Sequence, residues 1–93
     1  MTRRQITKSI LPLLERYGVR RASLFGSVAR GDDTSKSDVD ILVEMPEDAS
    51  LLELAGLKID LEEALSRDVD VLTYDSLHPL LRDRILREQK RIL

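Results

Sequence analysis

The sequence contains no cysteine and no tryptophan, and it has a single histidine among its 93 residues. Without cysteine there is neither a disulfide nor a thiolate metal site. A histidine-based catalytic triad would have to use His78, which precedes Pro79, where a structural role at a helix start is expected. No lysine follows a glycine-rich run, so the sequence offers no Walker-type phosphate loop and no GxGxxG fingerprint.

Long apolar runs are also absent. The opening residues Met1-Thr2-Arg3-Arg4-Gln5 lack the apolar segment of a signal peptide, and no stretch approaches the ~18 residues of a membrane span. Hydrophobic residues make up 42% of the chain and charged residues 34%, which is typical of a folded globular protein and not of a disordered one. We therefore expect one cytoplasmic domain over residues 1–93, with no membrane partner.

The net charge of −2 hides a strong asymmetry along the chain. Residues 1–30 hold seven basic side chains and one acid, residues 31–76 hold fourteen acids and three bases, and residues 77–93 hold five bases and two acids. A mildly acidic protein is not expected to be a general nucleic-acid binder. The acidic middle fits a metal-dependent site whose phosphate partner meets arginines, and it fits solvated helix surfaces equally well.

The first expected helix covers residues 2–17 and begins at a capping box headed by Thr2. Pro12 lies inside it and removes a hydrogen bond, which costs about 3 kcal/mol in a helix interior. The pattern therefore predicts either a kink near Lys8 or a helix that starts closer to Thr7. Its apolar stripe recurs at helical spacing and consists of Ile6, Ile10, Leu13, Leu14 and Tyr17.

The rest of the chain alternates between strand and helix patterns. Strands are expected at residues 20–25, 38–44 and 68–73, and helices at residues 50–65 and about 79–89. Ser50 and Ser76 are the expected helix caps, and the chain end adds to the last helix or forms a short edge strand. The expected buried residues of the two helices are Leu51, Leu54, Ala55, Leu61, Ala64 and Leu65, and then Leu80, Leu81, Ile85 and Leu86. This order predicts an α/β fold with a small mixed sheet of three or four strands flanked by helices.

Two carboxylates lie on one face of the central expected strand. Strand side chains alternate between faces, so Asp38 and Asp40 point the same way, roughly 6–7 Å apart, while Val39 and Ile41 enter a core. Side-by-side anions repel each other, and partly buried ones lose hydration. A divalent cation offsets both costs, and hard oxygen ligands suit Mg²⁺, which also recruits substrate phosphates.

A Gly26-Ser27 turn precedes the carboxylates and supplies a complementary feature. Glycine lets a ligand approach the backbone closely, and exposed N–H groups at a helix start attract phosphate oxygens. The third expected strand would lie beside the second, about 4.8 Å away, and bring either Asp68 or Asp70 next to the first carboxylate pair. A phosphate-binding turn followed by clustered carboxylates predicts chemistry on a nucleoside triphosphate.

These residues, in their order and spacing, resemble a known signature. Gly26-Ser27, then Gly31, then Ser37-Asp38-Val39-Asp40 resembles that of the DNA polymerase β-like nucleotidyltransferase superfamily. The short chain and the segment Leu24–Gly31 are most similar to minimal nucleotidyltransferases, the MNT antitoxins that are paired with HEPN toxins. The resemblance implies the polymerase β-like core fold, and it extends from the first helix to Glu88.

The resemblance also implies roles for the carboxylates. Asp38 and Asp40 would hold the metal ion that arrives with the nucleotide, and these two with Asp70 would hold a second ion, with Mg²⁺ or Mn²⁺ as the cofactor. The Val69-Asp70-Val71 context favours Asp70 over Asp68 as the third ligand, and Asp70 would help to deprotonate the acceptor hydroxyl.

Further roles follow for the turn before the carboxylates. Gly26 and Ser27 would bind the β- and γ-phosphates of ATP. Arg30 would neutralise the departing charge, or would instead pair with Asp32 or Asp33 at the surface.

The function implied by the resemblance is transfer of AMP from ATP to a tyrosine of a partner HEPN RNase toxin. Two alternatives remain open on the sequence alone. The chain could be an antitoxin that neutralises its toxin only by binding, or a nucleotidyltransferase that acts on a small molecule or an RNA end.

Overall fold

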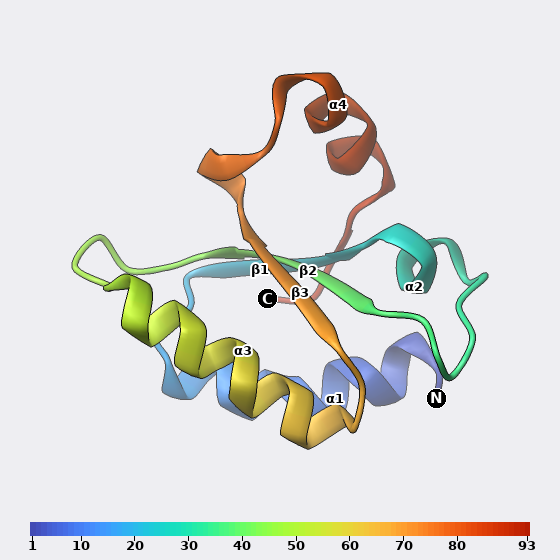
Figure 1. Ribbon diagram of the computed structural model, residues 1–93, viewed down its shortest axis with the longest axis horizontal. Helices are drawn as coiled ribbons and strands as arrows, with labels where there is room; N and C mark the ends of the chain where they lie inside the picture. The colour runs from blue at the N-terminus through green and yellow to red at the C-terminus, as the bar shows by residue number, and fades with distance from the viewer.

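The computed structural model describes residues 1–93 and shows a four-stranded mixed sheet flanked by helices (Figure 1). Its elements are, in chain order, α1 (Arg3–Arg16), β1 (Arg21–Phe25), α2 (Gly26–Arg30), β2 (Val39–Glu44), α3 (Leu51–Leu65), β3 (Val69–Thr73), the 3₁₀ turn η1 (Tyr74–Ser76), α4 (Pro79–Glu88) and β4 (Lys90–Arg91). The expected α/β fold class and the order of its elements are confirmed.

The strands are arranged in the order β3-β2-β1-β4. The central strand β2 pairs antiparallel with β1 and parallel with β3, and β4 pairs antiparallel with β1. Helix α3 makes the crossover that a parallel pair needs. A short edge strand was one of the two states expected for the chain end, and it is present as β4 at residues 90–91. The terminal Ile92 and Leu93 lie beyond the strand and pack against the core.

Both faces of the sheet are covered. Helices α1 and α3 lie on one face and α4 lies on the other, below and above the sheet in Figure 1. The main core, on the α1 and α3 side, contains Ala22, Leu24 and Ile41. A smaller cluster includes Phe25 and Leu42, which the period-2 alternation of strands directs to the opposite face, together with Leu77 and Ile85. The face of β2 that carries Asp38 and Asp40 therefore becomes apolar at Leu42, the next residue on that face.

Helix α1 runs without interruption from its capping box to Arg16, with Pro12 inside it. The Thr2 hydroxyl accepts a hydrogen bond from the amide of Gln5 at 3.1 Å, and the Gln5 side chain accepts one from the amide of Thr2 at 2.7 Å. The alternative start near Thr7 is wrong. The predicted stripe is confirmed, with Ile6, Ile10 and Leu14 fully buried, and this burial offsets the cost of the proline.

Helix α3 is capped by Ser50 as expected, but its buried face differs from the prediction. Leu61 and Leu65 are buried as expected, and Leu57 is buried without having been predicted, whereas Leu51 is 85% exposed and Ala55 and Ala64 are also exposed. The contact between α1 and α3 determines which side of α3 is buried.

That contact is centred on Gly56. A Cβ added there would lie 3.1 Å from the Tyr17 hydroxyl, which in turn donates a 2.6 Å hydrogen bond to Asp60. The absence of a side chain at Gly56 lets the tyrosine ring of α1 reach across α3. Glycine is unfavourable inside a helix, and the close packing of Tyr17 against Gly56 offsets that cost.

Helix α4 begins after His78, and not after Ser76 as predicted. The His78 imidazole accepts a hydrogen bond from the amide of Leu80 at 3.1 Å, and Pro79 fixes the first helical residue. The expected burial of Leu80 and Leu81 is wrong, since they are 86% and 51% exposed. Ser76 instead closes the 3₁₀ turn by a hydrogen bond to Thr73.

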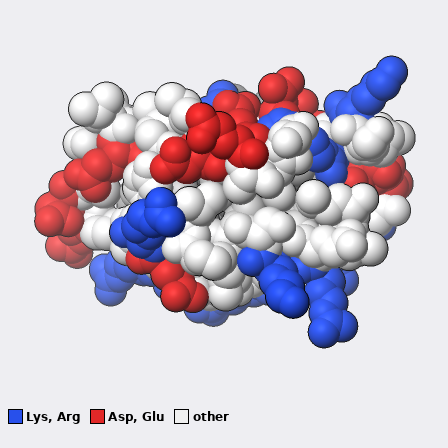
Figure 2. Space-filling view, turned by 90° about the horizontal axis from the view of Figure 1, so that it is seen from below, with Lys and Arg blue, Asp and Glu red and all other residues white.

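The charge asymmetry of the sequence persists on the surface. Figure 2 looks at the side of α1 and α3, where acidic side chains gather at the upper middle and left and many basic ones lie along the lower edge. The two basic chain ends meet in one hollow lined by Arg3, Arg4, Lys8, Lys90 and Arg91. None of the helices has the length and apolar character needed to cross a membrane.

Candidate active site

The candidate site lies where β2 and β3 begin and β1 ends. The parallel pairing of β2 with β3 makes Asp40 and Asp70 direct register partners, and the antiparallel pairing of β1 with β2 sets Phe25 opposite Asp40. Asp38 immediately precedes β2, and Asp68 immediately precedes β3. The register therefore brings Asp70 beside the predicted pair, and it leaves Asp68 two residues before that position.

The Gly26 backbone approaches Asp40 so closely that a side chain at position 26 would displace the Asp40 carboxylate. Gly26 adopts φ of +68°, a left-handed conformation that glycine tolerates best. A Cβ at this position would collide with the Asp40 carboxylate, lying 3.0 Å from its Cγ. The turn that opens α2 is thus packed directly against the central carboxylate, which joins the two halves of the sequence motif in space.

Asp40 is half-buried, and its environment disfavours the ionised form. Burial is the largest cause, and the negative charges of Asp70 and Asp38 add to it, so that the pKa of Asp40 is raised from 3.8 to about 6. Arg30 acts in the opposite direction and does not offset the others. The site consequently holds an excess of negative potential that a cation would relieve.

The carboxylates of Asp38, Asp40 and Asp70 have no hydrogen-bond or ion-pair partner within the protein. The side chains as they stand do not surround one point, since the structure has no group of three acidic, histidine or cysteine side chains arranged to hold a metal ion. Asp38 and Asp70 are both exposed, which leaves room for their side chains to reorient. Three hard oxygen donors without competing partners fit a divalent cation such as Mg²⁺ or Mn²⁺.

Ser27 and Arg30, the other predicted nucleotide-binding residues, both lie on α2. The Ser27 side chain is partly exposed and makes no hydrogen bond within the protein. Arg30 donates to Asp32 at 3.2 Å and to Glu88 of α4 at 3.2 Å. The surface pairing that was the alternative for Arg30 is therefore present, and the contact with α4 was not foreseen.

Arg67 was missed by the sequence reasoning. Its guanidinium lies against the loop that leads into β2 and forms an ion pair with Asp33 at 3.3 Å. The only available signal was a lone arginine directly ahead of the Asp68-Val69-Asp70 segment in an otherwise acidic stretch. Asp68 makes no side-chain hydrogen bond, and Ser66 is the C-cap residue of α3.

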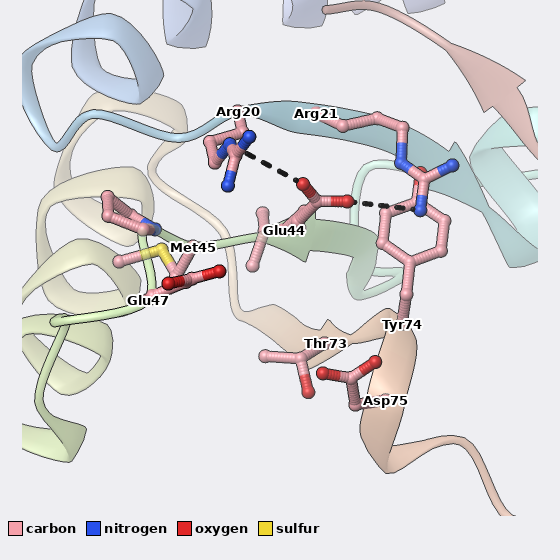
Figure 3. Close-up of a pocket in the computed structure, with 10 residues that line it drawn as sticks. Arg20, Arg21, Glu44, Met45, Glu47, Thr73, Tyr74 and Asp75 are labelled. Carbon is pink, nitrogen blue, oxygen red and sulfur yellow. Dashed lines mark ion pairs between the residues drawn. The ribbon is translucent and has the colours of Figure 1, made fainter.

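A separate hollow of about 380 Å³ lies at the far end of β2 (Figure 3). Glu44 forms ion pairs there with Arg21 at 3.2 Å and Arg20 at 3.7 Å, and the Arg21 guanidinium lies 4.0 Å from the centre of the Tyr74 ring. Glu44 thus pairs with both arginines of this hollow, although the Nε atom of Arg21 is buried without a hydrogen-bond partner. It is remote from the carboxylates in the register of β2 and contains none of the predicted site residues.

Comparison with known proteins shows the family to which the chain belongs. The model of the family described as Nucleotidyltransferase domain matches residues 6–92. A protein of Methanocaldococcus jannaschii, provisionally named a protein adenylyltransferase, is 55% identical over 89 residues that cover 96% of each chain. A solved structure provisionally described as a minimal nucleotidyltransferase is 40% identical, with a TM-score of 0.83 over 97% of this chain and 95% of that one.

A second solved structure is that of a toxin–antitoxin with the ATP analogue AMP-PNP. It is 26% identical, with a TM-score of 0.81 over 94% of this chain and 72% of that one. The fold and the family match together define an enzyme of the nucleotidyltransferase class. The chain belongs to the nucleotidyltransferase domain family.

Proposed function

We propose that this nucleotidyltransferase is an antitoxin that transfers AMP from ATP to a tyrosine hydroxyl of a partner HEPN RNase toxin. The observation that carries the reaction type is the register pair of Asp40 and Asp70, with Asp38 beside it and the Gly26 turn packed against it. The protein acceptor is supported by the name of the M. jannaschii relative, and the antitoxin role by the toxin–antitoxin structure that contains AMP-PNP.

Each residue of the site has a separate role in the proposed reaction. Gly26 and Ser27 bind the β- and γ-phosphates through backbone N–H groups and the hydroxyl, and Arg30 offsets charge on the departing pyrophosphate. Asp70 accepts the proton of the acceptor hydroxyl, whose oxygen forms a bond to the α-phosphorus. The bond from that phosphorus to the β-phosphate bridging oxygen then breaks, and pyrophosphate leaves.

Two divalent cations fit this arrangement. Asp38 and Asp40 would hold the ion that accompanies the triphosphate, and these two with Asp70 would hold the other. When bound, such ions stabilise the attacking and the leaving oxygen of an in-line displacement. The raised pKa of Asp40, about 6, means that a cation would bind with loss of a bound proton below that pH.

A partner protein also fits the surface of the chain. Leu51, Leu52 and Ile59 on α3 and Leu80 on α4 are all more than half exposed. Leu80 lies on the opposite side of the sheet from α3, so only the three apolar residues of α3 are proposed as a contact surface for the partner.

The test is intact-mass spectrometry of the protein encoded by the neighbouring gene, after incubation with this chain, ATP and Mg²⁺. Mass gains in steps of one AMP are expected, with none for an Asp38→Asn/Asp40→Asn double variant. Fragmentation of the modified protein should place the AMP on tyrosine.

The choice of third carboxylate is tested in the same assay. Asp70→Asn should lower the initial rate by at least about a hundredfold, because it removes both a cation ligand and the proton acceptor. Asp68→Asn is the matched control and should retain most of the rate. Equal losses in both variants would contradict the assignment to Asp70.

The other functions give different outcomes. A tight complex without any mass gain would favour an antitoxin that acts by binding alone. A mass gain absent from every protein tested, with AMP incorporated into an antibiotic or an RNA 3′ end, would favour the other transferase activities.

A further inference from the structure

The side chain of Arg67 joins the start of β3 to the loop that carries Asp38. Its Nε and Nη2 atoms both donate to the carbonyl of Ser37, at 3.1 and 2.8 Å. Nη2 also donates to the carbonyl of Thr34 at 3.0 Å and to Asp33 at 3.3 Å. These contacts bridge about thirty residues of sequence, so they fix the loop relative to the sheet and not only within itself.

Both peptide groups that flank Asp38 are held by the same short segment. The Ser37 carbonyl, just before Asp38, accepts from Arg67, and the Val39 amide, just after it, donates to the Asp68 carbonyl at 2.9 Å. The Asp38 side chain itself stays exposed and unpaired. The backbone of Asp38 is thus fixed from both sides while its carboxylate is left free to bind.

The contact requires an arginine. The Arg67 side chain is 8% exposed and Asp33 is 17% exposed, so the ion pair is largely shielded from water. A guanidinium carries five N–H donors in a rigid planar fork. Two of its nitrogens can therefore donate to the Ser37 carbonyl while the same fork also reaches the Thr34 carbonyl and Asp33. A lysine ammonium has no such fork. Ser66, with φ of +53°, turns the chain out of α3 and directs the next residue toward the loop.

We propose that Arg67 is a positioning residue, which holds the 32–38 loop so that Asp38 is presented beside Asp40 and Asp70. This role rests on the proposed function, in which Asp38 is a cation ligand. Because Arg67 precedes Asp70 by three residues, one segment fixes the positions of two of the three carboxylates. Residues that orient cation ligands typically change cation affinity by about 10- to 100-fold when they are replaced.

The first measurement is hydrogen–deuterium exchange of the metal-free protein. In Arg67→Lys, the amides of Ser37 and Val39 should exchange at least about tenfold faster, because the loop that holds them against the carbonyls of Thr34 and Asp68 loses its charged anchor. Arg21→Ala is the control, because it removes an ordered arginine at the far end of β2 and should leave the exchange of the loop unchanged. Normal loop exchange in Arg67→Lys would overturn the proposal.

The second measurement is the affinity for Mn²⁺ by calorimetry, with thermal unfolding to confirm that each variant is folded. Arg67→Lys should bind Mn²⁺ about tenfold or more weakly than the wild type. Asp33→Asn should have a smaller effect, because the carbonyl contacts of Arg67 remain.

A faster-exchanging loop with unchanged Mn²⁺ affinity would overturn the positioning role while leaving the proposed function intact. Failure of the wild-type protein itself to bind Mn²⁺ would overturn the proposed function, and the role of Arg67 with it. The two failures are distinguishable, because one appears only in the variant.

Discussion

Replacing the central carboxylate should stabilise the protein while destroying its proposed activity. The pKa of Asp40 is raised to about 6, mainly by burial and then by the charges of Asp70 and Asp38. The folded state therefore binds this proton more tightly than the unfolded state, and stability falls as the pH rises from about 4 to about 6. Above this window the full penalty of the ionised carboxylate is present.

The magnitude follows from the size of the shift. The rise in the pKa of Asp40 from 3.8 to about 6 corresponds to about 3 kcal/mol of lost stability. Solvent screening at this half-exposed carboxylate reduces the loss to about 1–2 kcal/mol. Asp40→Asn removes the charge and keeps the shape. In EDTA at pH 8 its Tm should exceed that of the wild type by about 4–16 °C, whereas near pH 3.5 the two should coincide.

The assay is thermal unfolding of both proteins across this pH range, with and without Mg²⁺. Asp75→Asn, which removes an exposed acid from the other end of β3, is the control and should follow the wild type. Added Mg²⁺ should stabilise the wild type and leave Asp40→Asn unchanged. A lower Tm for Asp40→Asn at pH 8 in EDTA would refute the electrostatic account of the site.

Two further substitutions probe the close approach and the core. Gly26→Ala should lower the transfer rate at least about tenfold, because its Cβ displaces Asp40, whereas Gly31→Ala shares the positive φ but meets no atom within 4 Å and should keep most of the activity. Equal losses would mean that backbone strain alone is responsible. Leu57→Ala should cost about 2–5 kcal/mol in urea unfolding and Leu51→Ala less than about 0.5 kcal/mol, and the reverse order would contradict the observed orientation of α3.

The arrangement of the carboxylates could be anticipated from the sequence because strand geometry is simple. A period of two places Asp38 and Asp40 on one face, and a neighbouring parallel strand of the same pattern brings a third carboxylate beside them. The register then pairs Asp70 with Asp40, as the Val-Asp-Val context favoured. The capping box at Thr2 was equally predictable, since it depends only on residues three apart.

The buried face of α3 could be predicted only at Leu61 and Leu65, because apolar residues surround most of the first half of that helix. Leu51, Leu54, Ala55, Leu57 and Ile59 offer several apolar stripes, and the sequence pattern does not choose among them. The choice is made by a tertiary contact between α1 and α3, in which a tyrosine packs over a glycine. Sequence periodicity carries no information about such a contact.

Arg67 was missed for a related reason. Its partners are the carbonyls of Thr34 and Ser37, and backbone acceptors thirty or more positions away leave no signature in side-chain patterns. The pairing of Arg30 with Asp32 could be anticipated because the two are neighbours, whereas its contact with Glu88 depends on how α4 crosses the sheet.

The most direct test of the account is anomalous diffraction from crystals of this protein grown with Mn²⁺ and a non-hydrolysable ATP analogue. The account predicts manganese bound by the carboxylates of Asp38 and Asp40, with a second ion that also contacts Asp70, and the β- and γ-phosphates against the Gly26-Ser27 turn. Manganese and nucleotide bound elsewhere, with these three carboxylates free of the metal, would contradict it.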